Sequence, residues 1–107
     1  QKLQNLKCSA CSSTTPPLTD KEILNNLQKL IDWNLNDEKK MIYKKYKFKS
    51  FKKALIFTNL IGELAEKEGH HPDIWFGWGY AKIKIFTHAI KGLHESDFVL
   101  AAKIDKI

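Results

Sequence analysis

The spacing of apolar residues constrains the fold of this chain most, because it switches between the period of a helix and the alternation of a strand. Helical spacing marks residues 20–31, a segment between Ser50 and Gly69, and a last segment that starts around Glu95. Alternation marks two pairs of segments, 33–35 with 41–48 and 73–79 with 80–88. The order α-β-β-α-β-β-α predicts an α+β fold in which three helices cover one face of a four-stranded antiparallel sheet.

Capping residues indicate where the helices begin and end. Thr19 and Glu22 have the spacing of a capping box, so the first helix should run from Asp20 to about Ile31. Ser50 is a candidate N-cap for the second helix, and Gly69 stands where a C′ glycine would end it. The buried stripe expected on this second helix consists of Phe51, Ala54, Leu55, Thr58, Ile61, Leu64 and Ala65.

Residues 1–17 form an N-terminal extension, and residues 18–107 form the domain itself. The extension ends in the turn-rich run SSTTPP, so we expect it to lie outside the core. It contains Cys8 and Cys11 in a CxxC pattern. One such pair is at most half of a zinc site, and the sequence has no second pair. We therefore interpret the two cysteines as a structural or incidental pair.

The net charge of +6 is the balance of eighteen basic residues, all of them lysine, against twelve acidic residues. Proteins that bind phosphates or guanine edges commonly use arginine, whose planar group donates two hydrogen bonds at once. The lysines are also spread along the whole chain, so we expect a solvated basic surface and no direct nucleic-acid partner. The sequence shows no bilayer-spanning run and no secretory signal, so we expect a cytoplasmic protein without membrane contact, a nuclear pool being compatible with this.

Residues 68–92 contain three of the four histidines and two of the three tryptophans. His70 and His71 precede Pro72 just after the second helix, and neighbouring side chains in non-helical backbone point in different directions. His88 falls at the end of the last predicted strand, on the face opposite the isoleucines of that strand. We therefore expect His88 to point away from the core.

Three interpretations of these histidines stay open. Each one alone could be an ordinary surface residue. Together they could bind a catalytic zinc ion, although the usual HxH and HExxH spacings are missing. Beside an aromatic stretch, they could instead give protons to a small molecule and take protons from it near neutral pH.

Two carboxylates could support proton transfer by the histidines. Glu66 lies one helical turn before His70 and could bond its ring if the helix extends that far. Asp97, early in the last helix, could accept a hydrogen bond from a histidine or cap the helix. A carboxylate partner would select one tautomer of the histidine and raise its pKa.

Several motifs together resemble the signature of the pterin-4a-carbinolamine dehydratase family. The run EKEGHHPDIWFGWGYAKIKIFTHAIKGLHESD holds the acidic residue, HHP, aromatic strand, T-H pair, G-L and aspartate of that signature. DWN at Trp33, YKFKSFKKA and the lead-in LKCSACSSTTPPLTDKEI extend the resemblance over nearly the whole chain. The resemblance implies a lyase that removes water from 4a-hydroxytetrahydropterin, gives quinonoid dihydropterin and supports tetrahydropterin recycling, with no metal and no cofactor.

The resemblance also implies roles for individual residues. His70, His71 and His88 occupy the three histidine positions of the family, where they would act as general acid and base. Glu66 and Asp97 match its supporting carboxylates. The residues implied to contact the pterin are His70, His71, Pro72, Thr87, His88 and Trp33.

The chain departs from the family pattern at two places. Residues 76–79 replace the usual Asn-Val-Tyr-Asn, and His94 stands where a Ser or Thr usually caps the last helix.

The resemblance also implies partners. Family members form dimers or tetramers, so we expect a homodimer or homotetramer. The alternative is a non-catalytic oligomerisation or transcriptional partner module on the same fold, which would bind a transcription factor or a hydroxylase.

Overall fold

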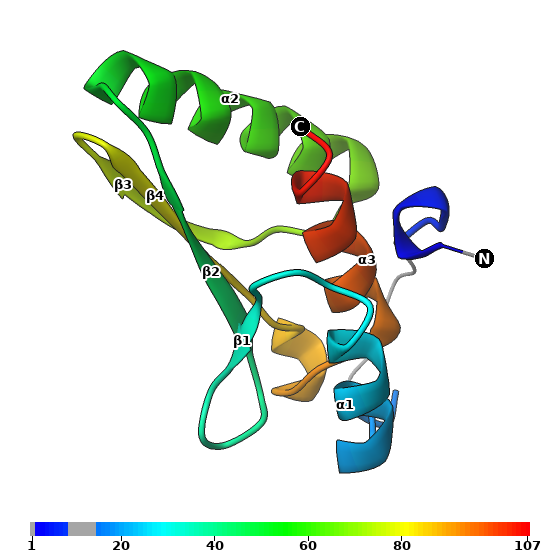
Figure 1. Cartoon of the computed structure of the whole chain (residues 1–107). Coiled ribbons are helices and arrows are strands. Elements are labelled where there is room, and N and C mark those ends of the chain that lie inside the picture. The colour runs from blue at the N-terminus through cyan, green and yellow to red at the C-terminus, as the bar shows by residue number, and fades with distance from the viewer. Residues whose placement is uncertain (1, 9–14) are drawn as a thin grey trace.

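The structure is a computed structural model that describes residues 2–8 and 15–107. Its elements are η1 (Leu3–Asn5), α1 (Asp20–Leu27), β1 (Asn34–Leu35), β2 (Ile42–Lys47), α2 (Phe51–Glu68), β3 (Asp73–Gly77), β4 (Tyr80–Ile85), η2 (His88–Ile90) and α3 (Glu95–Ile104). The two η elements are single turns of 3-10 helix. The predicted α+β fold, with three helices on one side of a four-stranded sheet, is confirmed (Figure 1).

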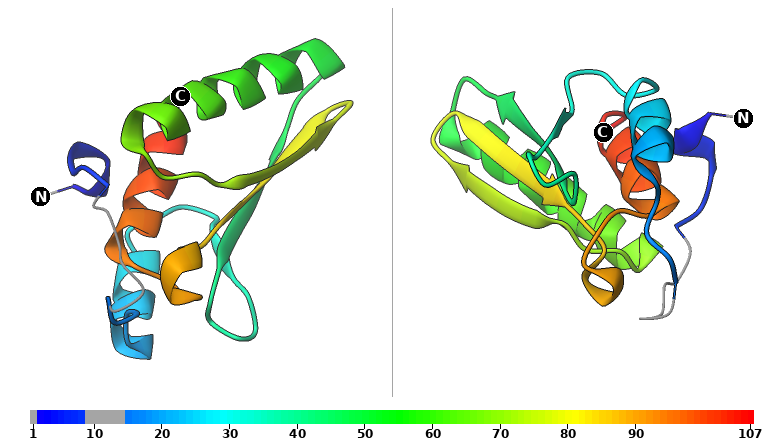
Figure 2. Two further views of the ribbon diagram at one scale, coloured as in Figure 1. Left: turned by 180° about the vertical axis from the view of Figure 1, so that it is seen from behind. Right: turned by 90° about the horizontal axis from the view of Figure 1, so that it is seen from below.

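The four strands form one antiparallel sheet in the order β1-β2-β4-β3. The central pair β2–β4 runs from Ile42 opposite Ile85 to Lys47 opposite Tyr80. The helices lie on one side of this twisted sheet and leave its other face uncovered (Figure 2). Because successive side chains of a strand point to opposite faces, each central strand has one face in the core and one outside it.

The core lies between the sheet and the helices, and α3 runs through its middle. Every residue from Ser96 to Ala102 is buried, because α1, α2 and η1 all pack against α3. The sheet contributes isoleucines from β2 and β4 that are fully buried. No helix within residues 2–8 and 15–107 is long and apolar enough to span a bilayer.

The predicted caps are confirmed, but the first helix is shorter than we predicted. Thr19 and Glu22 form the capping box, Ser50 caps α2, and Gly69 ends α2 with a positive φ of 65°. The first helix, however, ends at Leu27 rather than near Ile31. The chain turns after Leu27, and a positive φ of 60° at Asp32 redirects it, so that the next side chain, a tryptophan, enters the core.

Two further expectations about burial are wrong. In the predicted stripe of α2, Phe51 and Leu55 are 47% and 36% exposed, because α3 packs against only the C-terminal end of α2 (Figure 1). The N-terminal extension does not lie wholly outside the core either. Leu3 is 5% exposed and belongs to the core cluster, since η1 packs on α3. The domain boundary after residue 17 stays a prediction.

Candidate active site

The C-terminal end of α2 positions His70. Gly69 adopts the left-handed conformation, and the amide groups of Gly69 and His70 both donate to the carbonyl oxygen of Ala65. This arrangement turns the chain away from the helix axis and toward α3. The His70 side chain is only 13% exposed, and its Nε2 lies 2.5 Å from Oδ1 of Asp97.

Asp97 is a fully buried carboxylate in the first turn of α3. Its Oδ2 accepts from the Thr87 hydroxyl at 2.8 Å and from the His94 amide at 2.9 Å. Its Oδ1 faces His70. When Asp97 is ionised it can only accept, so the bonded Nε2 of His70 must carry a proton. A neutral His70 then has Nδ1 free of a proton and able to accept one.

The N-terminus of α3 explains how Asp97 serves two purposes. His94 is the N-cap residue, and its Nδ1 accepts from the Ser96 amide at 3.2 Å. Asp97 completes the capping box by accepting from the His94 amide. Asp97 therefore both caps the helix and bonds a histidine, which the sequence had left as alternatives. The helix begins at Glu95, as predicted.

His71 and Glu66 form a second histidine–carboxylate pair, at the surface. Nε2 of His71 is hydrogen-bonded to Oε2 of Glu66, and the two side chains are 61% and 78% exposed. The expectation that Glu66 bonds His70 is wrong, because the turn at Gly69 directs His70 toward α3. An exposed pair of this kind contributes little to stability, so its main effect is on the orientation of the ring.

His88 lies in η2 and not on a strand, since β4 already ends at Ile85. Its side chain is exposed, and its ring contacts that of Phe86 in a tilted arrangement, with the centroids 4.2 Å apart. The preceding residue, Thr87, points inward to Asp97 and pairs with Gly92 across the loop. His88 is therefore exposed as expected, on a loop that begins at the Asp97 cluster.

The structure places Trp33 apart from the histidines. The indole Nε1 donates to Oδ2 of Asp105 at 2.9 Å. Asp105 follows the last residue of α3, eight positions after Asp97, which is about 12 Å along a helix axis. Pro72, by contrast, is partly buried and directly follows the His70–His71 pair.

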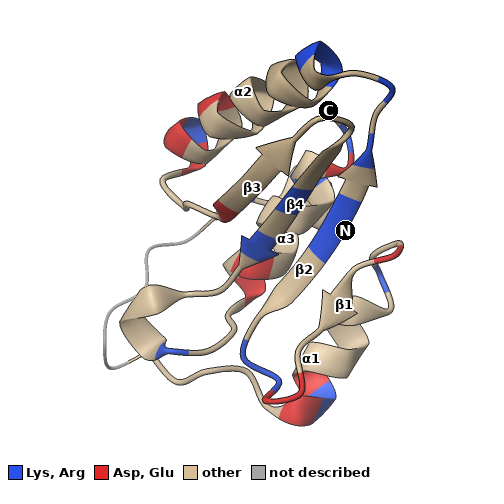
Figure 3. Ribbon diagram, turned by 90° about the vertical axis from the view of Figure 1, so that its left-hand side faces the viewer, with Lys and Arg blue, Asp and Glu red and all other residues tan. Residues whose placement is uncertain are grey.

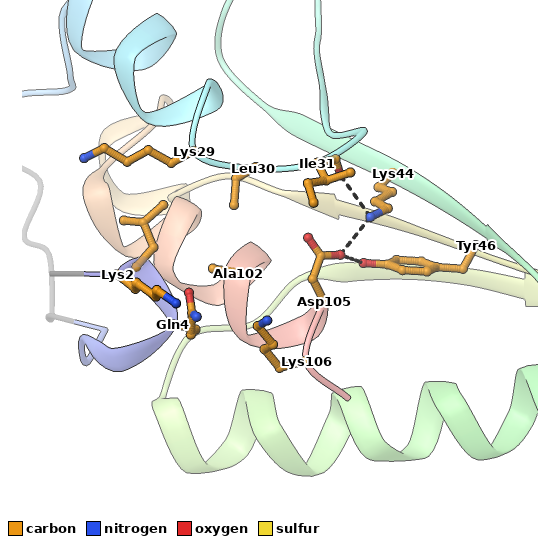
Figure 4. A pocket seen from close by; sticks show the side chains of 11 residues that line it. Lys2, Gln4, Lys29, Leu30, Ile31, Lys44, Tyr46, Ala102, Asp105 and Lys106 are labelled. Carbon is orange, nitrogen blue, oxygen red and sulfur yellow. Dashed lines mark hydrogen bonds and ion pairs between the residues drawn. The ribbon is translucent and has the colours of Figure 1, made fainter.

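A cavity of about 760 Å³ lies beside Asp105, at this far end of α3 (Figure 4). Asp105 there accepts from Lys44 Nζ at 2.8 Å and from the Tyr46 hydroxyl. Burial and the neighbouring Asp105 raise the pKa of Tyr46, so the phenol remains a donor. No predicted site residue lines this cavity, which is therefore separate from the histidine cluster.

The N-terminal segment touches both sides of the His70–Asp97 pair, a contact that the sequence did not signal. The Cys8 amide donates to Oε1 of Glu68 at 3.2 Å, and its thiol donates to the Ser96 carbonyl oxygen at 3.6 Å. Burial and the Glu68 carboxylate raise the pKa of Cys8 to about 12, so its thiol stays protonated. Cys11, the other half of the CxxC pattern, lies outside the described residues.

The site thus holds imidazoles with different surroundings. His70 is anchored by a buried carboxylate, His71 by an exposed one, and His88 stands on the adjoining loop. Such groups can give and take protons near neutral pH. Within the described part of the chain, no group of three His, Cys, Asp or Glu side chains is arranged to hold a metal ion.

Comparison with known proteins identifies the family. Residues 16–107 match the family model described as Pterin 4 alpha carbinolamine dehydratase. A protein of Alkaliphilus metalliredigens with the provisional name pterin-4-alpha-carbinolamine dehydratase is 53% identical over 106 residues, which cover 97% of this chain and 94% of the relative. The chain belongs to the pterin-4a-carbinolamine dehydratase family.

Two solved structures are similar to this fold. A crystal structure titled transcriptional coactivator/pterin dehydratase, from Brucella melitensis, has a TM-score of 0.80 and 30% identity, and the match covers 85% of this chain and 97% of that one. A pterin dehydratase-like protein identified as a RuBisCO assembly factor in the alpha-carboxysome has a TM-score of 0.61 and 26% identity, with 71% and 88% coverage.

Proposed function

We propose that this chain is a hydro-lyase that dehydrates 4a-hydroxytetrahydropterin to quinonoid dihydropterin and water, as a step in tetrahydropterin recycling. The observation that carries the proposal is the His70–Asp97 pair, in which a partly buried imidazole lies 2.5 Å from a fully buried carboxylate. Thr87 and the His94 amide hold that carboxylate in place. Membership of the family supports a pterin as the substrate.

The chemistry needs one proton donor and one proton acceptor. The C4a–O bond breaks, the leaving hydroxyl takes up a proton and departs as water, and N5 loses a proton as the C4a=N5 double bond forms. Imidazoles can perform both transfers near neutral pH. We assign these transfers to His70 and His88, and His71 contacts the pterin and shares the proton work. Asp97 and Glu66 orient the rings of His70 and His71.

Stopped-flow absorbance of freshly generated 4a-hydroxytetrahydropterin tests this function directly. The wild-type chain should accelerate decay of the substrate, with or without a chelator, whereas His70→Ala and His88→Ala should each lose about 10²- to 10⁴-fold in rate. His94→Asn is the matched control, because it removes an imidazole while asparagine remains a good N-cap for α3. The control should stay close to wild type.

The outcomes separate the competing interpretations. A wild-type rate no faster than buffer would contradict the enzyme. Loss of the rate with chelator would favour a bound metal, and an equal loss in His94→Asn would point to damaged folding rather than lost proton transfer.

A second proposal concerns partners, and a specific observation favours it. Apolar side chains of α2 are exposed, among them Ile56 at 49% and Leu60 at 42%. Contiguous exposed apolar patches are typical of protein–protein contact sites. We therefore propose a homodimer or homotetramer. The two similar structures, described as a transcriptional coactivator/pterin dehydratase and as a RuBisCO assembly factor, support a partner-binding role beside catalysis.

A further inference from the structure

The face of the sheet that no helix covers gathers lysines and aromatic rings. Residues directly opposite in an antiparallel pair point to the same face, and the register places Lys45 opposite Lys82 and Tyr43 opposite Lys84. We call this surface the open face, and it consists of Tyr43, Lys45, Lys47, Asp73, Trp75, Tyr80, Lys82 and Lys84. Figure 3 shows the basic segments of β2 and β4 side by side, with α3 behind the sheet.

The charge of the open face is unbalanced. It has four lysines and a single carboxylate, Asp73, which stands opposite Lys84. Lys45 and Lys82 face each other directly, and like charges in that position destabilise a sheet. The lysine ion pairs found in the described residues involve other lysines, none of them on this face. The ion pairs therefore leave the positive charge of this face unbalanced, whereas an anionic ligand would neutralise it.

The aromatic rings of the open face lie in the same layer as the cations. Lysine ammonium groups lie over three rings: Lys84 over Trp75 at 4.7 Å, Lys45 over Tyr80 at 5.3 Å and Lys82 over Tyr43 at 5.5 Å. The Trp75 side chain is 48% exposed. Cations that alternate with aromatic rings match a ligand that alternates phosphates with flat bases. An acidic peptide would satisfy the lysines but would give the rings nothing to stack on.

We propose that the open face binds single-stranded nucleic acid, with its lysines on the phosphates and its aromatic rings stacked on the bases. The sequence led us to expect no direct nucleic-acid partner, because the lysines are spread along the chain. The fold brings four of them from two strands onto one surface. Binding through phosphates and stacked bases does not require a particular nucleotide sequence, and it weakens as the salt concentration rises. This activity is independent of the histidine site.

Fluorescence anisotropy with a labelled oligo-dT and the full chain tests the proposal, with circular dichroism to verify folding. Neutralisation of four phosphates predicts a slope of about −2.8 in log K against log salt. Lys45→Glu/Lys82→Glu should weaken binding by at least about 10-fold and reduce the slope to about −1.4. Trp75→Ala should weaken binding by about 5-fold or more through lost stacking.

Lys52→Glu/Lys53→Glu is the matched control, since both lysines are exposed in the first turn of α2 and the net charge changes equally. The control should bind within about 2-fold of wild type if binding is local to the open face. The proposal would be overturned if the wild-type chain did not bind at low salt, or if the control lost as much affinity as Lys45→Glu/Lys82→Glu. It would also be overturned if Trp75→Ala bound as tightly as the wild type and polyglutamate competed as well as DNA. The last result would assign the face to an acidic protein.

Discussion

Asp97 shows how one residue can couple the stability of this fold to its candidate chemistry. A buried carboxylate is costly unless donors surround it, and Asp97 accepts from Thr87, His94 and His70. Two of these bonds hold α3 and the loop before it, and the third fixes the histidine. A substitution at Asp97 would therefore change folding and proton transfer together. Variants of His70 separate the two effects better, because the other two bonds to Asp97 remain.

Glu68 is a single residue whose contribution to the stability of the fold should depend on pH. Partial burial pushes its pKa up, but the Cys8 amide and Lys103 ammonium outweigh burial and hold the pKa below the usual 4.5. Since the folded pKa is the lower one, the stabilisation is present above about pH 4.5 and is lost as the pH falls through the folded value. Glu68→Gln should lower the free energy of unfolding by about 1 kcal/mol at pH 7. Urea unfolding from pH 7 to pH 3 should show this difference shrinking.

Glu63→Gln is the control for that series, because Glu63 is an exposed acidic residue on the same helix. It should change the free energy of unfolding by less than about 0.5 kcal/mol at neutral pH. If the Glu68→Gln difference stayed constant down to pH 3, the carboxylate would not be the stabilising group.

Contacts between residues close in sequence could be predicted best, although a bond from Asp97 to a histidine was also among the expectations, and His70 lies 27 positions away. The Thr19–Glu22 capping box is such a local contact. Glu66 was assigned to His70 by helical spacing, yet the backbone conformation at Gly69 gives it to His71. The bond from Trp33 to Asp105 joins residues 72 positions apart, and no local pattern could signal it.

At the scale of elements, the glycine inside α2 and the glycine that ends it lead to opposite predictions. A Cβ added at Gly69 or Gly62 would meet no atom within 4 Å, so backbone conformation alone decides the outcome. Gly69 has a φ of 65°, where an L-residue pays about 1–2 kcal/mol, so Gly69→Ala should destabilise the protein by that amount. Gly62 is helical, and Gly62→Ala should stabilise it by about 0.5–1 kcal/mol.

Urea unfolding midpoints of the two variants measure this pair, with each protein serving as the control for the other. If both unfolding midpoints shifted in the same direction, side-chain packing or the denatured state would determine the change in stability instead of backbone conformation. Because Gly69 also directs His70 toward Asp97, Gly69→Ala should reduce the proposed dehydratase activity as well, whereas Gly62→Ala should not.

Periodicity predicted the three α-helices and the four strands of the described residues but neither of the 3-10 turns, and it misplaced some ends. Leu30 and Ile31 continue the helical spacing although α1 has already ended at Leu27. Likewise, the alternation of β4 continues to His88, whereas Thr87 pairs with Gly92 instead of with β2. In both places the tertiary contacts of the next segment decide the boundary, and sequence spacing does not record them.

For the whole molecule, α3 is the element around which the others assemble. Its burial depends on η1, whose Leu3 comes from a segment that reads as a turn-rich extension. Local composition gave no sign that this segment would cover the core. The first turn of α3 carries Asp97 and its hydrogen bonds, and the residue that follows its last turn is Asp105. The helix therefore connects the candidate site with the cavity.

The exposed strand edge and the exposed apolar side chains of the single chain predict an oligomer. The sheet order leaves β3 as an edge strand, and Phe76 on it is 36% exposed beside Phe51 of α2. Edge strands and exposed apolar side chains are both sites of association. Light scattering should therefore show a dimer or tetramer at micromolar concentration, and Ile56→Lys/Leu60→Lys should shift it toward smaller species.

The matched control is Leu24→Lys/Ile31→Lys, which changes two equally apolar residues that are 49% and 73% exposed and lie outside α2. If association uses α2, this control should keep the wild-type mass, because general loss of surface hydrophobicity is the same in both variants. A monomeric wild-type chain would contradict the prediction outright. Equal dissociation in both variants would show that association is nonspecific, and the exposed residues of α2 would then need another partner.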